Sequence, residues 1–148
     1  MLRIIGIGSP HGDDRFGWAV VEALHQQGLP AGVQLQSLDR PGPALLSHLQ
    51  AGGPTILVDA ADAGLPAGQL RWVDRRELAR APLDGETSHC LGIQESLQLA
   101  DALNIELPPI KLLICQLAQS DPLAGLSPQV EAAVGRACDE LCRLVVFS

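Results

Sequence analysis

Near the amino terminus stands the stretch Gly6-Ile7-Gly8-Ser9-Pro10-His11-Gly12-Asp13-Asp14-Arg15-Phe16-Gly17-Trp18, which joins an apolar run to an amphipathic segment through a turn with two adjacent acids. Glycine adopts positive φ angles and lets another backbone approach closely. A carboxylate at a helix start faces the unpaired amide groups there. The stretch therefore predicts a strand-to-helix turn that either carries a functional site or is capped by Asp13.

Strand-like and helix-like patterns alternate along the rest of the chain. At 148 residues the chain is long enough for one domain with its own core, so we expect a single domain over residues 1–148. The alternation is typical of a parallel sheet covered by helices. Apolar runs predict strands over Leu2–Ile7, Val33–Leu38, Thr55–Asp59 and Lys111–Leu117, with a weaker signal over Gln69–Val73.

Helical spacing of apolar residues fills the gaps between these strands. One helix is expected from Phe16 to Gly28, and a short one after Pro41. The last helix should begin at Pro128 with Ser127 as its cap. A helix from about Cys90 would place on one side the apolar residues Ile93, Leu97, Ala100 and Leu103.

Composition excludes several classes of function. A net charge of −7 and a pI near 4.9 argue against a nucleic-acid partner, because phosphates need clustered Lys and Arg. The one basic cluster, Arg71 to Arg80, is interpreted as a solvated face. No run of 18 apolar residues predicts a membrane span, and Leu2–Ile7 is too short for a signal-peptide core, so we expect a cytoplasmic protein. The four cysteines form no C-x-x-C pair and suit free thiols.

Acidic residues follow each of the first three predicted strands. Asp13 and Asp14 come after the first strand, Asp39 after the second, and Asp59 is the last residue of the third. Ligands of open α/β sheets bind beyond the carboxyl ends of the strands. A carboxylate at the end of a buried strand is costly unless it is paired, hydrogen-bonded or bound to a cation. We therefore interpret Asp59 as functional, and Asp62 as a turn-stabilising acid.

His89 has the most favourable context among the four histidines. It precedes a predicted helix start, and Gly92 leaves space for a close approach. One imidazole and two carboxylates suit a divalent metal ion. Asp14, Asp59 and His89 would form such a metal site if the fold brings them together.

Four motifs, in this order and spacing, resemble those of the hydrogenase maturation endopeptidases. They are Gly6-Ile7-Gly8-Ser9 leading to Gly12-Asp13-Asp14, then Val58-Asp59-Ala60, then His89–Leu97, and Gly125-Leu126-Ser127-Pro128. The resemblance covers nearly the whole chain. It implies a three-layer α/β/α sandwich around a mostly parallel twisted sheet of about five strands.

The resemblance also implies an activity and its partner. Family members remove a short C-terminal extension from the precursor of the large subunit of a nickel-iron hydrogenase, after nickel has been inserted. Asp14, Asp59 and His89 are then the residues expected to contact the nickel, which arrives in the substrate. Hydrolysis needs a carboxylate as base. Asp14 and Asp39 are the candidates, because no serine or cysteine has an evident partner.

This sequence departs from the family pattern at several positions. Ser9 stands where many relatives have asparagine, and Arg15 replaces a common glycine. Relatives follow the acid at Asp39 with two glycines and a threonine, whereas this chain continues with the stiffer and more basic Arg40-Pro41-Gly42-Pro43. We interpret these departures as differences in the client hydrogenase.

Two other classes of function are considered. A nucleotide-binding domain would explain Gly6 and Gly8, but the third glycine of that fingerprint falls at His11 and no phosphate loop occurs, so no nucleotide cofactor is expected. A non-catalytic chaperone of the nickel-loaded subunit would use the same three metal contacts for recognition alone.

Overall fold

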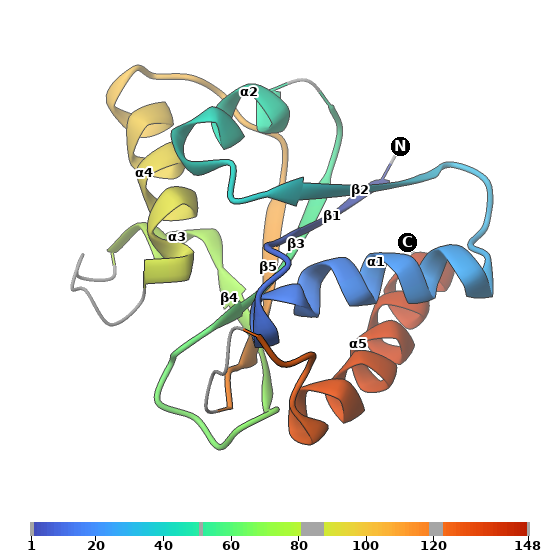
Figure 1. Ribbon diagram of the computed structural model, residues 1–148. Helices are drawn as coiled ribbons and strands as arrows, with labels where there is room; N and C mark the ends of the chain where they lie inside the picture. The colour runs from blue at the N-terminus through green and yellow to red at the C-terminus, as the bar shows by residue number, and fades with distance from the viewer. Residues whose placement is uncertain (1, 51, 81–87, 119–122, 148) are drawn as a thin grey trace.

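The computed structural model describes residues 2–50, 52–80, 88–118 and 123–147, and for residues 78–80, 88–91, 146 and 147 only the backbone (Figure 1). One sheet of five strands has the order β2-β1-β3-β5-β4. The first four of these strands are parallel, and β4 runs antiparallel to β5 at the edge. The strands are β1 (Leu2–Gly8), β2 (Val33–Asp39), β3 (Thr55–Ala61), β4 (Leu70–Asp74) and β5 (Ile110–Gln116).

Helices cover both faces of the sheet, as Figure 1 shows. One face carries α1 (Phe16–Gln27) and α5 (Pro128–Phe147), and the other carries α2 (Leu45–Gln50) and α4 (Ser88–Ala102). Short 3-10 turns, η1 (Gly12–Arg15) and η2 (Gly42–Ala44), precede α1 and α2, and α3 (Arg75–Arg80) follows β4. The three-layer α/β/α sandwich expected from the sequence is confirmed.

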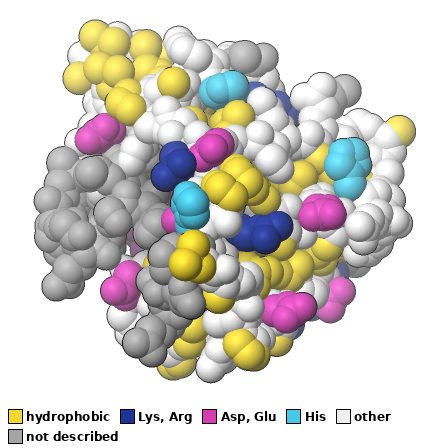
Figure 2. All heavy atoms as spheres, in the orientation of Figure 1, with side chains coloured by type: hydrophobic (Ala, Val, Ile, Leu, Met, Phe, Trp, Pro, Cys, Tyr) yellow, Lys and Arg dark blue, Asp and Glu magenta, His cyan; other side chains and the backbone are white. Residues whose placement is uncertain are grey.

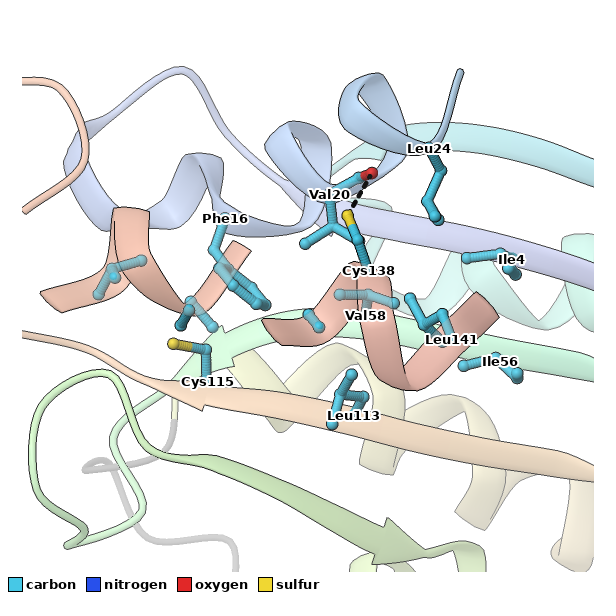
Figure 3. Close-up of a cluster of buried hydrophobic side chains, with 14 of the residues drawn as sticks. Ile4, Phe16, Val20, Leu24, Ile56, Val58, Leu113, Cys115, Cys138 and Leu141 are labelled. Carbon is cyan, nitrogen blue, oxygen red and sulfur yellow. Dashed lines mark hydrogen bonds between the residues drawn. The ribbon is translucent and has the colours of Figure 1, made fainter. Parts of the chain in front are cut away.

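Two apolar cores, one on each face of the sheet, hold the layers together. The core under α1 and α5 joins Phe16, Val20 and Leu24 to Val58 and Leu141 (Figure 3). The core on the other face is built from apolar residues of β1, β3 and β5 with α2 and α4. The helical spacing of apolar residues correctly predicted which sides of the helices are buried, except at Leu103. The prediction for Leu103 is wrong, because α4 ends at Ala102 and Leu103 is 59% exposed.

Glycines in the opening stretch serve close packing of α1 on the sheet. A Cβ at Gly17 would meet the carbonyl oxygen of Ile7 and lie 2.6 Å from that of Val58, and a Cβ at Gly6 would meet the Gly17 carbonyl oxygen. The helix therefore rests directly on the backbones of β1 and β3. Among the glycines of the opening stretch, Gly12 is the one with a positive φ, at 55°.

The remaining expectations about surface and thiols hold in the part of the chain that the structure describes. Arg71 pairs with Glu77, and Arg75 with Asp101, as expected for a solvated face. Of the cysteines, Cys115, Cys138 and Cys142 are free thiols, whereas the side chain of Cys90 lies outside the described residues. No described helix has the length and apolar character needed to cross a membrane.

Candidate functional site

A cavity of about 350 Å³ lies at the carboxyl ends of β1 and β3. In the sheet β1 lies between β2 and β3, so the chain moves outward from β1 first to one side and then to the other. Open α/β sheets form their ligand crevice at the point where the strand order reverses in this way. Figure 2 shows acidic, basic and histidine side chains close together near the middle of the face turned to the viewer. The lining residues are Ile7, Gly8, Asp14, Arg40, Pro41, Gly42, Leu45, Asp59, Gly92 and Ile93.

Asp59 is a buried carboxylate that is only half satisfied. Its residue is 2% exposed, and Oδ1 accepts a hydrogen bond of 2.8 Å from the Ala60 amide. Oδ2 is buried and has no hydrogen-bond partner among the described residues. Burial raises the pKa of Asp59 well above its ordinary value, and the charge of Asp14 raises it further, against the Ala60 hydrogen bond. Ionisation of Asp59 is therefore unfavourable in the absence of a partner, and a bound cation would offset that cost.

Asp14 lines the same cavity from the turn after β1. Its Oδ2 accepts a hydrogen bond of 3.2 Å from the hydroxyl of Ser9, a residue with no exposed surface. The Ser9 hydroxyl itself accepts the His11 amide at 3.3 Å, so its one proton is left for Asp14. In the sequence Ser9 stands out only as a departure from the family pattern, because nothing local shows that it supports the acid five residues later.

The third expected metal residue is carried by α4. His89 lies in the first turn of this helix, and its side chain lies outside the described residues. Gly92 and Ile93, about one turn further along α4, line the cavity with Asp14 and Asp59. A Cβ at Gly92 would come within 2.9 Å of the Gly42 Cα, which confirms the predicted close approach at this glycine. Within the described side chains alone, no group of three potential ligands converges.

Asp13 does not cap the helix that follows it, contrary to expectation. Neither η1 nor α1 has a side-chain cap. Instead the carboxylate, 2% exposed, accepts hydrogen bonds from the Ala118 amide (3.0 Å), the Ser127 amide (2.7 Å) and the Ser127 hydroxyl (3.0 Å). Asp13 thus ties the end of β5 and the start of α5 to the turn that bears Asp14.

Asp13→Ala is expected to lower the free energy of unfolding by about 3 kcal/mol, because it leaves partly buried amides without their charged acceptor. Ser127→Ala removes only one of the three hydrogen bonds and should cost about 1 kcal/mol. Urea denaturation followed by circular dichroism measures both. Equal losses for the two variants would contradict the assigned role of Asp13.

The sequence of this chain matches those of known proteins. A family model described as hydrogenase maturation protease matches residues 18–144. The chain belongs to the hydrogenase maturation protease family. It is 29% identical to the hydrogenase expression/formation protein HupD of Bradyrhizobium diazoefficiens, over 97% of this chain and 77% of HupD. It is also 31% identical to the hydrogenase expression/formation protein HoxM of Cupriavidus necator, over 97% of this chain and 75% of HoxM.

A solved structure gives the same result. The hydrogenase 2 maturation peptidase of a Thaumarchaeota archaeon is 28% identical and matches with a TM-score of 0.70 over 99% of each chain. The chain is therefore a peptidase built on the fold of this family. Membership in this family does not favour the nucleotide-binding alternative. A purely non-catalytic chaperone would differ from the family, whose members are peptidases.

In this maturation protease, Asp39 lies at the rim of the cavity and is not one of the residues that line it. Asp39 ends β2 beside Gly8 and is more than half exposed. Its Oδ1 accepts a hydrogen bond of 3.0 Å from Nε of Arg40. Arg40, and not Asp39, lines the cavity with Asp14 and Asp59. The two acids named as candidate bases are thus separated by position: one faces the cavity, and the other pairs with an arginine at its mouth.

Two of the described thiols, Cys115 and Cys138, do not offer a nucleophile. Burial raises the pKa of Cys115 to about 12 and that of Cys138 to about 11. Both therefore stay protonated near neutral pH, whereas the thiolate is the reactive form. Cys138 instead directs its sulfur toward the Val20 carbonyl in the core (Figure 3).

Proposed function

We propose that this peptidase removes the C-terminal extension of a nickel-iron hydrogenase large subunit after nickel insertion, and that it recognises the nickel carried by that substrate. Asp14, Asp59 and His89 are the proposed contacts to the nickel. The cytoplasmic location expected from the sequence is part of the same proposal. The observation that carries it is the buried Oδ2 of Asp59, which has no hydrogen-bond partner among the described residues and lies beside a cavity that a second carboxylate also lines.

The donor set suits a metal that is inspected rather than retained. Two carboxylates and one imidazole are acceptable ligands for nickel, but thiolates bind it more tightly. Such a site can therefore contact the nickel without removing it from the cysteines of the hydrogenase. The Asp59 charge, destabilised by burial, gains most when a cation arrives, so the substrate with its metal should bind better than the substrate without it.

Peptide hydrolysis requires a base that activates water close to the scissile carbonyl. Asp14 is the better candidate because it lines the cavity, and the Ser9 hydroxyl holds one of its oxygens. Asp39 is the second candidate; it pairs with Arg40 and is not among the residues that line the cavity. The nickel, when present in the substrate, would polarise the carbonyl or orient the peptide.

The test is to incubate the protein with nickel-loaded and nickel-free large-subunit precursor and to follow loss of the extension by mass spectrometry. We expect cleavage of the nickel-loaded form alone. Asp14→Asn and His89→Ala should abolish that cleavage while circular dichroism stays unchanged. Cleavage of both precursor forms, or of neither, would contradict the nickel-recognition proposal, and binding without cleavage would favour the chaperone alternative.

A further inference from the structure

Arg40 has a strained backbone at the mouth of the cavity. Only two described residues other than glycine have a positive φ, Arg40 at 38° and Asn104 at 54°. Asparagine tolerates this region, because its short side chain bonds locally, whereas arginine does not share that advantage and the conformation is strained. Strain of this kind persists where the surrounding structure enforces it, and it is concentrated at functional sites.

The main chain fixes where this strained residue stands. The Arg40 amide donates a hydrogen bond of 3.0 Å to the Gly8 carbonyl, at the end of β1. Pro41, with its restricted φ, follows at once and also lines the cavity. The base of the Arg40 side chain is therefore held beside the turn that carries Asp14.

The guanidinium of Arg40 is available to a ligand. Its side chain is 63% exposed, and its one partner among the described residues is Asp39, through Nε and Oδ1. Exposed ion pairs of this type are weak, so a second carboxylate can bind the guanidinium beside Asp39. The two Nη groups have no hydrogen-bond partner in the described part of the chain, and a planar guanidinium presents them as a fork that matches a carboxylate.

Arg40 also has the opposite charge to the other ionisable residues in the described lining, Asp14 and Asp59. The whole chain carries a net charge of −7. An anionic group on a peptide would be repelled from this cavity unless a cation stood at its entrance. The positive charge of Arg40 at the entrance therefore indicates that the cavity accepts an anionic group.

Resting on the proposed function, we propose that Arg40 is a specificity-determining residue that binds a carboxylate of the precursor through its Nη groups. Asp39 holds the guanidinium in place from the other side, through Nε. The carboxylate is either an acidic side chain of the extension or the terminal carboxylate of the extension. Both have the same chemistry and can be separated by the choice of substrate.

The decisive variant is Arg40→Gly, because glycine adopts the observed φ without strain while the whole side chain, with its guanidinium, is removed. Arg40→Lys keeps the charge but loses the fork. Arg71→Ala is the matched control, since Arg71 is a similarly exposed arginine in an ion pair with Glu77 and lies on β4, at the far edge of the sheet. Each variant is tested on three nickel-loaded precursors: the intact form, one with the acidic side chains of the extension changed to amides, and one with an amidated C-terminus.

We expect Arg40→Gly to lower kcat/KM for the intact precursor on the order of 10-fold, mainly through KM, as for loss of a charge-assisted hydrogen-bond pair. Arg40→Lys should lie between it and the wild type, and Arg71→Ala should match the wild type. On the precursor that lacks the recognised carboxylate, Arg40→Gly and the wild type should become equal, which identifies the source. The melting temperature of Arg40→Gly should be no lower than that of the wild type.

Two results would overturn the inference: no effect of Arg40→Gly on the intact precursor, or the same loss on all three precursors. Failure of the wild type to cleave any precursor would contradict the proposed function instead. In that event, the affinities of the same variants for the same precursors still test Arg40, because the expected difference is one of binding.

Discussion

Asp59→Asn is expected to abolish processing of the nickel-loaded precursor and, at the same time, to raise the thermal stability of the protein. The substitution preserves shape, and its amide oxygen can still accept the Ala60 hydrogen bond. It replaces a buried ionisable group whose Oδ2 has no hydrogen-bond partner among the described residues and whose ionisation is opposed by burial and by the charge of Asp14. We expect a gain of roughly 1–3 kcal/mol at neutral pH, which for a domain of this size corresponds to several degrees in Tm.

The pH dependence of this gain has a definite sign. Because the pKa of Asp59 is raised in the folded protein, the folded state keeps this proton to a higher pH than the unfolded state does. The wild type therefore loses stability as the pH rises from the unfolded pKa, near 4, toward the folded value. Asp59→Asn lacks this loss, so the difference in Tm between variant and wild type should grow with pH over that interval and then level off.

Asp62→Asn is the matched control for the same chemical change. Asp62 lies three residues further along the chain, and its Oδ1 accepts hydrogen bonds from the Gly64 amide and the Gln116 side chain. An amide oxygen keeps both, so processing and Tm should stay near the wild-type values. Full processing by Asp59→Asn would refute the metal assignment, and a lower Tm would show that this carboxylate serves the fold.

Gly17→Ala is expected to destabilise the fold by about 3 kcal/mol or more, although alanine is the better helix former. The added methyl would meet the backbone of β1 and lie 2.6 Å from the Val58 carbonyl oxygen of β3. Backbone atoms in the middle of a sheet cannot give way as a flexible side chain can, so α1 would have to move off the sheet. The urea midpoint of the purified variant measures the loss.

The control for Gly17→Ala is Gly135→Ala. Gly135 lies inside α5, is exposed, and has open space around its Cβ direction. Here the same substitution should stabilise the protein by about 0.5–1 kcal/mol, through helix propensity alone. Opposite signs at the two positions are the expected result, and a Gly17→Ala variant as stable as the wild type would mean that α1 does not rest on the strand backbones.

Much of the architecture could be predicted from local patterns. Short apolar runs alternating with helical spacing predicted the parallel sheet, and Asp62 was recognised as a turn acid from its surroundings. The edge strand β4 gave only a weak signal, because a half-covered strand of five residues has little periodicity to detect. The end of α4 was missed at Leu103, since the left-handed Asn104 that follows stops the helix without a glycine or proline.

The sequence by itself determined the α/β class, the family, and the placement of acids at the carboxyl ends of successive strands. Only the tertiary structure decided what each acid does. Asp13 bonds to Ser127 across 114 positions, and Asp59 shares a cavity with Asp14 and keeps an Oδ2 that has no hydrogen-bond partner in the described part of the chain. Periodicity and turn chemistry are local properties of the chain, whereas hydrogen-bond partners, burial and the shifted pKa of Asp59 arise from groups that meet only when distant segments pack together.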